Sequence, residues 1–218
     1  MPRIALLGAE CTGKTTLSQE VAAALRSRGQ NCMVIPEYSR QWCEQHGRAP
    51  RREEQAGIAA TQTRHIEEAA AGDWLIADTT ALTTAIYSDL HFGDRGLHAM
   101  ALAAQQGFDL TLLCATDLPW IADGLQRDGP AQQMSCDKLL REALTQNQIP
   151  YRVIYGSGPE RLRNALACLV RLGLKPLGDE VPAPSRWRWS CEKCSDPDCE
   201  HRLFAELLRT REFGTGPV

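Results

Sequence analysis

The stretch GAECTGKT, residues 8–15, constrains the fold of this chain more than any other, because it has the pattern G-x-x-x-x-G-K-[ST]. An apolar run, Arg3 to Leu7, precedes it, and a segment with apolar residues at helical spacing, Thr15 to Arg28, follows it. A strand, a glycine turn and a helix in this order predict a loop whose backbone N–H groups and helix N-terminus bind phosphate oxygens. The alternative is a glycine-rich turn that matches the pattern by coincidence, and such a turn would not be expected to lie between a strand and a helix.

The loop assigns roles to individual residues of a nucleotide site. Lys14 is expected to reach the β- and γ-phosphates, and the Thr15 hydroxyl to bind Mg²⁺. The residues predicted to hold ATP are Gly8, Glu10, Cys11, Thr12, Gly13, Lys14, Thr15 and Thr16. The sequence therefore predicts ATP and Mg²⁺ as cofactors.

Strand-like apolar runs recur along the chain, separated by segments of helix length. They cover 3–7, 32–35, 74–77, 110–114 and 152–155, and helical segments are expected at 15–28, 53–71, 136–147 and 159–172. The alternation predicts an α/β fold with a parallel five-stranded sheet flanked by helices. The segment 53–71 is expected to cover the sheet edge or the substrate pocket. Prolines gather after Gly173, so residues 1–173 are predicted to form one domain and 174–218 a linker and a small Cys/His-rich tail.

The composition favours chemistry on small molecules. The chain has 218 residues, 43% of them hydrophobic, and a net charge of −3, so no basic field attracts nucleic acid or an anionic membrane. No apolar run approaches the roughly 18 residues of a membrane span, and the N-terminal residues are typical of a strand rather than of a signal peptide. These features predict a cytoplasmic protein with a small-molecule substrate; they do not indicate an oligomeric state.

Polar residues follow the ends of the predicted strands, where ligands of open parallel sheets bind. Glu37, Tyr38, Arg40 and Trp42 come after the second strand. Glu37 can accept the proton of a substrate hydroxyl, or it can be a carboxylate favoured by the dipole at a helix start. Tyr38 and Trp42 can stack on a flat ring.

Two further groups follow the third and fourth strands. Asp78 directly follows the third strand, at the position where P-loop NTPases have a magnesium-binding aspartate. The alternative is an aspartate that only stabilises a turn. Trp120, Asp123 and Arg127 are typical of a lid, and Arg127 is expected to neutralise the transferred phosphoryl group. The alternative is that Trp120 belongs to the core and that Asp123-Gly124 forms a turn.

The motifs GAECTGKT, PEYSR, IADTTALTT and LPWIADGLQ together resemble the ribosylnicotinamide kinase domain of NadR-type NAD-salvage enzymes. The similarity covers roughly residues 3–173. It implies a thymidylate-kinase-like P-loop NTPase fold and transfer of the γ-phosphoryl group of ATP to the 5′-hydroxyl of nicotinamide riboside, which gives nicotinamide mononucleotide.

The resemblance also implies roles for matching positions. Asp78 would serve both the metal and the acceptor, and Glu37, Tyr38, Arg40, Trp120 and Asp123 would surround the riboside or the lid. Together with the chemistry of the residues themselves, this gives the predicted catalytic set Lys14, Glu37, Asp78 and Arg127 and the predicted substrate-binding set Glu37, Tyr38, Arg40, Trp42, Asp78, Trp120 and Asp123. Two positions depart from the family pattern: Thr80 stands where a second aspartate is common, and Gln126 stands where an arginine is common. The first departure predicts that the acceptor site has one charge fewer.

The tail carries a compact group of metal-ligating residue types. Cys191, Cys194, Cys199 and His201 form C-x₂-C-x₄-C-x-H, which predicts a structural Zn²⁺ site, with a reduced and metal-free tail as the alternative. The preceding RWRW, residues 186–189, is expected to pack on the core rather than stack on bases. The other six of the nine cysteines are expected to behave as small hydrophobic residues.

The sequence thus predicts an ATP-dependent small-molecule kinase acting on a ribosyl hydroxyl, with nicotinamide riboside as the leading acceptor and with Glu37 or Asp78 orienting the hydroxyl. One alternative is a kinase for another nucleoside or small alcohol. The other is a P-loop ATPase switch that uses the Cys-rich tail to bind a partner or nucleic acid.

Overall fold

A computed structural model of the chain describes residues 1–69, 72–121 and 129–175. Its centre is a sheet of five parallel strands, in the order β2-β3-β1-β4-β5. The strands are β1 (Arg3–Leu7), β2 (Cys32–Ile35), β3 (Trp74–Asp78), β4 (Leu110–Cys114) and β5 (Tyr151–Ile154). The predicted α/β fold with a five-stranded parallel sheet is confirmed, and each strand lies within one residue of its predicted bounds.

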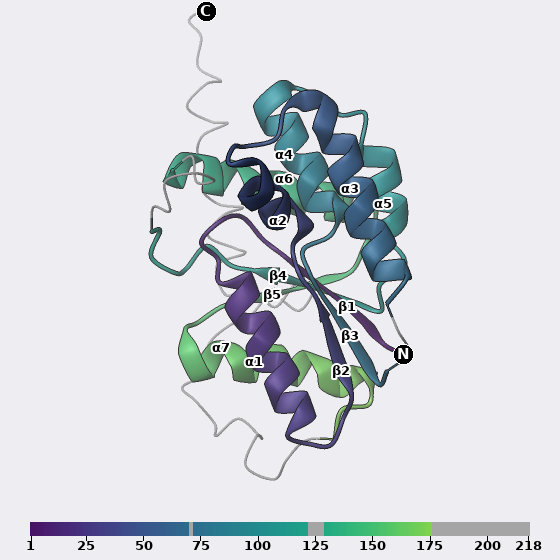
Figure 1. Ribbon diagram of the computed structural model, residues 1–218. Coiled ribbons are helices and arrows are strands. Elements are labelled where there is room, and N and C mark those ends of the chain that lie inside the picture. The colour runs from purple at the N-terminus through teal and green to yellow at the C-terminus, as the bar shows by residue number, and fades with distance from the viewer. Residues whose placement is uncertain (70–71, 122–128, 176–218) are drawn as a thin grey trace, which may run out of the picture.

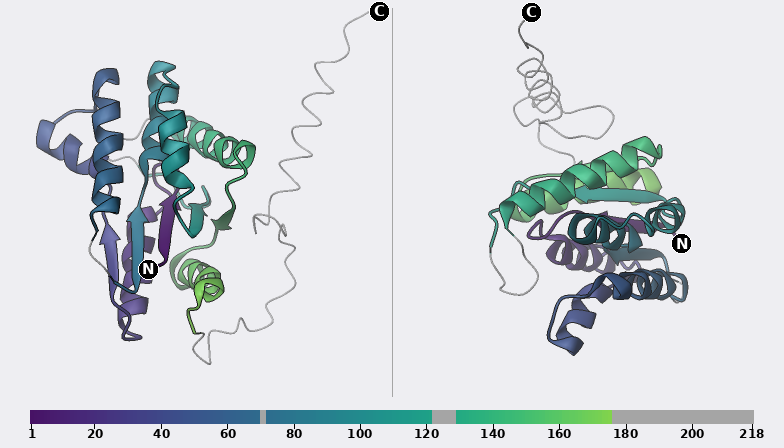
Figure 2. Two further views of the ribbon diagram at one scale, coloured as in Figure 1. Left: turned by 90° about the vertical axis from the view of Figure 1, so that its right-hand side faces the viewer. Right: turned by 90° about the horizontal axis from the view of Figure 1, so that it is seen from above.

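Helices cover both faces of this sheet (Figure 1). On one face lie α1 (Lys14–Arg26) and α7 (Gly158–Leu169), and a 3₁₀ turn, Val170–Leu172, follows α7. The other face carries α3 (Arg52–Glu67), α4 (Ala81–Phe92), α5 (His98–Gln105) and α6 (Pro130–Gln146). The short helix α2 (Tyr38–His46) packs against α3, and Figure 2 shows these two helices at one end of the helical layer and α6 at the other.

The core consists of two apolar layers, one on each face of the sheet. Ile4 and Leu6 of β1 pack with the apolar residues of α1 and α7, whereas Leu7 packs with those of α4 and α6. Successive side chains of a strand point to opposite faces, so a strand between two helical layers needs apolar residues at nearly every position. This is why the strands are mostly apolar. Leu174 also packs in the layer beneath α1 and α7, while the predicted domain boundary near 173 stays a prediction.

Three helices, α2, α4 and α5, lie outside the predicted helical segments. Helix α4 has β-branched residues that lower helix propensity, and it is buried on several sides, so it lacks the single apolar stripe of a surface helix. Thr80 caps it by accepting a hydrogen bond from the Leu82 N–H at 3.3 Å. Within the described ranges, no helix has both the length and the apolar character that a membrane crossing requires.

Candidate functional site

A cavity of about 590 Å³ lies at the carboxyl ends of the central strands. The phosphate loop forms one wall, and α2, α3, α4 and the loop between α2 and α3 form the others. The lining residues are Glu10 to Thr16, Glu37, Ser39, Arg40, Cys43, Ala49, Pro50, Gln55, Thr79, Thr83, Thr84, Tyr87, His91 and Phe92. The structure therefore joins the predicted phosphate site and part of the predicted acceptor site in one space.

The phosphate loop is shaped by its own residues. Gly8 has φ +148°, and a Cβ atom there would lie 2.7 Å from the Thr12 Oγ1 atom. Gly13, with φ +71°, begins α1. The Thr12 hydroxyl and the Lys14 ammonium both donate to the Ala9 carbonyl oxygen, each at 2.8 Å. Thr12 is thus a buried brace of the loop, while the Lys14 side chain bonds only to a carbonyl that phosphate oxygens can replace.

Buried side chains from distant elements hold the loop in place. Arg161, only 4% exposed, donates to the Thr12 carbonyl at 2.8 Å and to the Asp117 carboxylate at 2.8 Å. From the other side, the Tyr87 hydroxyl donates to the Glu10 carboxylate, and the Gln133 amide donates to the Glu10 carbonyl at 2.8 Å. Burial raises the pKa of Tyr87, so it remains a neutral donor. The phosphate loop is therefore pre-organised.

Asp78 is the last residue of β3 and is 2% exposed. Burial raises the pKa of its carboxyl, while a hydrogen bond with Thr15 and the charge of Lys14 oppose this rise. Its Oδ1 atom has no hydrogen-bond partner. An unpaired carboxylate oxygen beside a hydroxyl suits Mg²⁺, which prefers oxygen ligands, so these residues fit the predicted ion.

Glu37 stands at the start of α2 and lines the same cavity. Its Oε1 atom accepts from the Ser39 hydroxyl at 2.7 Å, and its Oε2 atom lies 3.9 Å from the Arg40 Nη2 atom. Glu37 does lie at a helix start, as the alternative interpretation expected, but its side chain makes no capping hydrogen bond. The carboxylate remains available to a bound acceptor.

The described cavity lining includes neither Tyr38 nor Trp42, and their substrate role stays a prediction. They pack together with Cys43 and Ile58. The Trp42 ring stacks on His46 at 3.8 Å between centroids, and the Arg48 guanidinium lies 4.9 Å from it. Both rings therefore have packing partners within α2 and α3 in this structure.

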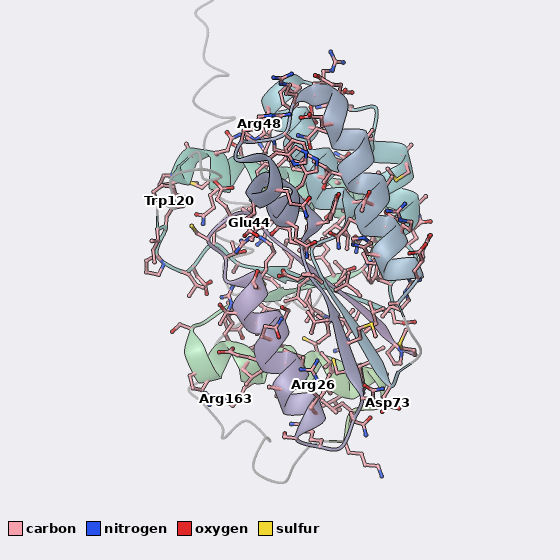
Figure 3. All side chains as sticks on the ribbon, viewed as in Figure 1. Arg26, Glu44, Arg48, Asp73, Trp120 and Arg163 are labelled. Carbon is pink, nitrogen blue, oxygen red and sulfur yellow. The ribbon has the colours of Figure 1, made fainter. Side chains whose placement is uncertain are left out.

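The predicted lid is described only in part. Trp120 is half-buried on the loop after β4, where Figure 3 labels it, and it does not belong to the described cavity lining. Asp123 and Arg127 lie outside the described residues, as do Cys191, Cys194, Cys199 and His201. The described ranges contain no cluster of metal-ligating side chains, and the zinc site stays a prediction.

Thr80, which stands where a second aspartate is common in the family, belongs to a buried hydrogen-bond network, and the missing charge in the acceptor site stays a prediction. The Thr80 hydroxyl donates to the Gln105 amide oxygen at 2.7 Å, and the Gln105 amide donates to Thr111 at 2.9 Å. All three residues are buried outside the cavity lining. The first departure from the family pattern therefore falls in a packing network beneath α5.

Sequence reasoning missed the cavity walls formed by α3 and α4. Gln55 of α3 and Thr83 of α4 are at least 94% buried, and the Thr83 Oγ1 atom has no hydrogen-bond partner among the described residues. Thr79, with its Oγ1 atom also unpaired, has φ +83°, a strained conformation for a β-branched residue. One signal was present: polar and aromatic residues at 83, 84, 87 and 91 share one helix face directly after the Asp78 motif.

The loop over the cavity, residues 47–51, is held by ionic contacts at the start of α3. The Arg48 guanidinium, labelled in Figure 3, donates to both Glu54 carboxylate oxygens at 2.8 and 2.6 Å. The Arg51 N–H donates to the same carboxylate at 2.7 Å. These bonds lower the pKa of Glu54 from 4.5 to about 2.

Replacing Glu54 with glutamine is expected to destabilise the protein at neutral pH only. The lowered pKa means that the carboxylate stabilises the fold above pH 4.5 and loses this effect as the pH falls from 4.5 toward 2. The difference in melting temperature between wild type and Glu54→Gln should be largest at pH 7 and shrink below pH 4.5. Thermal unfolding followed by circular dichroism measures it. The exposed neighbour provides the control: an equal, pH-dependent difference in Glu53→Gln would contradict the assignment.

The strand order, the phosphate loop and the adjoining cavity define a P-loop nucleotide-binding protein. A family model described as an AAA domain matches residues 3–161, and the chain belongs to this family. The predicted resemblance is also confirmed: the chain is 28% identical, over 155 residues, to the trifunctional NAD biosynthesis/regulator proteins NadR of Salmonella typhimurium and Escherichia coli. Each match covers 68% of this chain, which spans only 37% of the length of these relatives.

Solved structures share the fold. The NadR protein in complex with NR has a TM-score of 0.63 and 18% identity, covering 78% of this chain and 50% of the other. The NadR protein in complex with NAD and AMP-PNP has a TM-score of 0.63 and 17% identity, covering 81% and 51%. The deoxyadenosine kinase from M. mycoides with bound dATP has a TM-score of 0.55 and 15% identity, covering 78% and 100%.

Proposed function

We propose that this protein is an ATP-dependent kinase that phosphorylates the 5′-hydroxyl of a nucleoside, with nicotinamide riboside as the leading acceptor. The observation that carries the proposal is the cavity itself. It holds Lys14 and Thr15 of the phosphate loop on one wall and Glu37 and Arg40 on another. Phosphoryl transfer consists mainly of positioning and charge stabilisation, and a shared space for both substrates provides this.

The positions of the two carboxylates support different roles. Glu37 lines the cavity and is partly exposed, which suits a base that accepts the proton of the acceptor hydroxyl. Asp78 is buried beside Thr15, and together they would hold Mg²⁺, which when bound neutralises charge on the phosphates. Lys14 would exchange its bond to the Ala9 carbonyl for bonds to phosphate oxygens.

The acceptor part of the cavity suits a ligand with several hydrogen-bonding groups. Thr79 and Thr83 offer unpaired hydroxyls, and Gln55 offers an amide, on side chains that are nine-tenths or more buried. Burying such groups without a partner is costly, so they favour a ligand that pairs with them. The Gln55 amide matches a carboxamide, and the Glu10 and Glu37 carboxylates favour a cationic ring. Nicotinamide riboside combines both features, and the names of the relatives and structures agree with this choice.

A panel of acceptors tests the proposal. Transfer of labelled γ-phosphate from ATP is measured with nicotinamide riboside, adenosine, deoxyadenosine and cytidine. We expect kcat/KM to be highest for nicotinamide riboside. Replacing Gln55 with leucine should raise the KM for nicotinamide riboside roughly 5-fold, because one paired amide contributes about 1 kcal/mol, and should leave the KM for ATP unchanged. Gln106→Leu, which changes an exposed glutamine at the end of α5, is the control.

A second candidate is a kinase for another nucleoside. The Gln55 amide can pair with the edge of a purine or cytosine as well as with a carboxamide, and the deoxyadenosine kinase shares the fold. Highest kcat/KM for deoxyadenosine or cytidine in the same panel would favour this candidate. Transfer to none of the acceptors, with ATP hydrolysis alone, would contradict the nucleoside kinase proposal.

A further inference from the structure

Gln62 of α3 is a buried side chain that bonds to the backbone beside Glu37 and Asp78, although it does not line the cavity. It is 2% exposed. Its Oε1 atom accepts from the Tyr38 N–H at 2.7 Å, and its Nε2 atom donates to the Pro36 carbonyl at 3.4 Å and to the Thr79 carbonyl at 3.3 Å. One amide thus contacts the chain after β2 and the chain after β3.

The first two bonds lie on either side of Glu37. The Pro36 carbonyl belongs to the peptide group before Glu37, and the Tyr38 N–H belongs to the peptide group after it. The Tyr38 N–H is also in the first turn of α2, where no helix carbonyl can accept from it. Gln62 therefore fixes the backbone that carries the candidate base.

The third bond lies next to Asp78. Thr79 follows it directly, and its φ of +83° is a conformation that a β-branched residue adopts only when its surroundings hold it. The Thr79 N–H donates to the Leu6 carbonyl at 3.1 Å, and its carbonyl accepts from Gln62. These contacts hold the chain end that carries the candidate metal ligand.

We infer that Gln62 is a positioning residue, which sets the Glu37 carboxylate relative to Asp78 and hence the acceptor hydroxyl relative to the γ-phosphate. This inference rests on the proposed function, because it assigns Gln62 to the geometry of that transfer. Misplacing a reacting group by about 1 Å can cost on the order of 10²-fold in rate. The side chain acts through Glu37 and does not touch the substrates.

A buried glutamine can also be purely structural, and the chain offers a matched control for that role. Gln105 of α5 is 1% exposed and likewise bridges two segments, through the Thr80 and Thr111 hydroxyls. Thr80 directly follows Thr79, which lines the cavity, but Gln105, Thr80 and Thr111 do not line it. Gln62→Leu and Gln105→Leu thus remove the same group from similar surroundings.

The kinetic test is a double-mutant cycle with Glu37→Gln. We expect Gln62→Leu to lower kcat for phosphoryl transfer roughly 10- to 100-fold with an unchanged KM for ATP, and to have little further effect when Glu37 is already glutamine. Gln105→Leu should leave kcat within about 2-fold of wild type in both backgrounds at equal folded fraction. Equal losses of kcat in the two leucine variants, or a Gln62→Leu effect that multiplies with that of Glu37→Gln, would overturn the inference.

Gln62→Glu is the second variant if Gln62→Leu folds poorly. It keeps an acceptor for the Tyr38 N–H and removes the donor to the Pro36 and Thr79 carbonyls. We expect a kcat between those of wild type and Gln62→Leu. A kcat equal to that of wild type would show that the bonds to the two carbonyls position nothing.

Hydrogen exchange of the Tyr38 amide, measured by NMR, separates this inference from the proposed function. The amide should lose protection in Gln62→Leu and keep it in Gln105→Leu, whichever acceptor the enzyme uses. If wild type phosphorylates no nucleoside, the proposed function fails while the exchange result still tells whether Gln62 holds the Glu37 backbone. Unchanged protection in Gln62→Leu contradicts the inference, whatever the activity.

Discussion

Replacing Lys14 with alanine is expected to lower kcat for phosphoryl transfer roughly 10²- to 10³-fold, because it removes a donor to the charge that develops on the phosphates. The fold should remain intact. The side chain is half-buried, and its ammonium bonds only to the Ala9 carbonyl, which the Thr12 hydroxyl also contacts. Initial rates with saturating ATP and acceptor, together with the melting temperature of each variant, measure both effects.

Two further variants complete this test. Lys138→Ala removes an exposed lysine of α6 that contacts Glu142, and it should leave kcat unchanged. Lys14→Arg should recover little activity, because a planar guanidinium does not occupy the place of a compact ammonium. Substantial turnover in folded Lys14→Ala would contradict the assignment of the phosphate loop.

Replacing Glu37 with glutamine is expected to lower kcat roughly 10²- to 10⁴-fold and to change the KM of both substrates much less, as for a base that acts in the transition state. The amide keeps the shape of the side chain and its acceptor for the Ser39 hydroxyl, but it cannot take a proton. Steady-state kinetics over a range of acceptor concentrations separate kcat from KM.

The roles of the two carboxylates are separated by comparison. Asp78→Asn should raise the Mg²⁺ concentration needed for half-maximal rate, whereas Glu37→Gln should not. Glu44→Gln, which changes an exposed carboxylate of α2 labelled in Figure 3, is the control for charge on this helix. If Asp78→Asn lowers kcat at saturating Mg²⁺ and Glu37→Gln does not, Asp78 is the base.

Local signals explain which parts of the fold were predictable. The strand before the phosphate loop, the glycines and the helix after it are adjacent in the chain, and the strands are mostly apolar because helices cover both faces of the sheet. Helix α4 carried no such signal, since it is buried among other helices and rich in β-branched residues. Its cavity-lining face was therefore missed together with the helix.

The candidate site was predictable where a residue directly follows a strand. Glu37 and Asp78 were found in this way, because parallel strands bring their carboxyl ends to one edge of the sheet. The same rule selected Tyr38 and Trp42, which pack together with Cys43 and Ile58 and are absent from the described cavity lining. Position after a strand determines the edge on which a residue lies, but the direction of its side chain depends on the neighbouring helices.

The sequence by itself determined the phosphate loop, the parallel sheet and the edge of that sheet where ligands bind, because these follow from glycine positions and hydrophobic periodicity within short segments. Only the tertiary structure decided which polar side chains share the cavity and which ones brace it. Arg161 contacts Thr12 from 149 positions away, and Gln62 joins the ends of β2 and β3 from a helix between them. Such contacts depend on how helices pack on the sheet and on the direction of each side chain, and no local pattern records either.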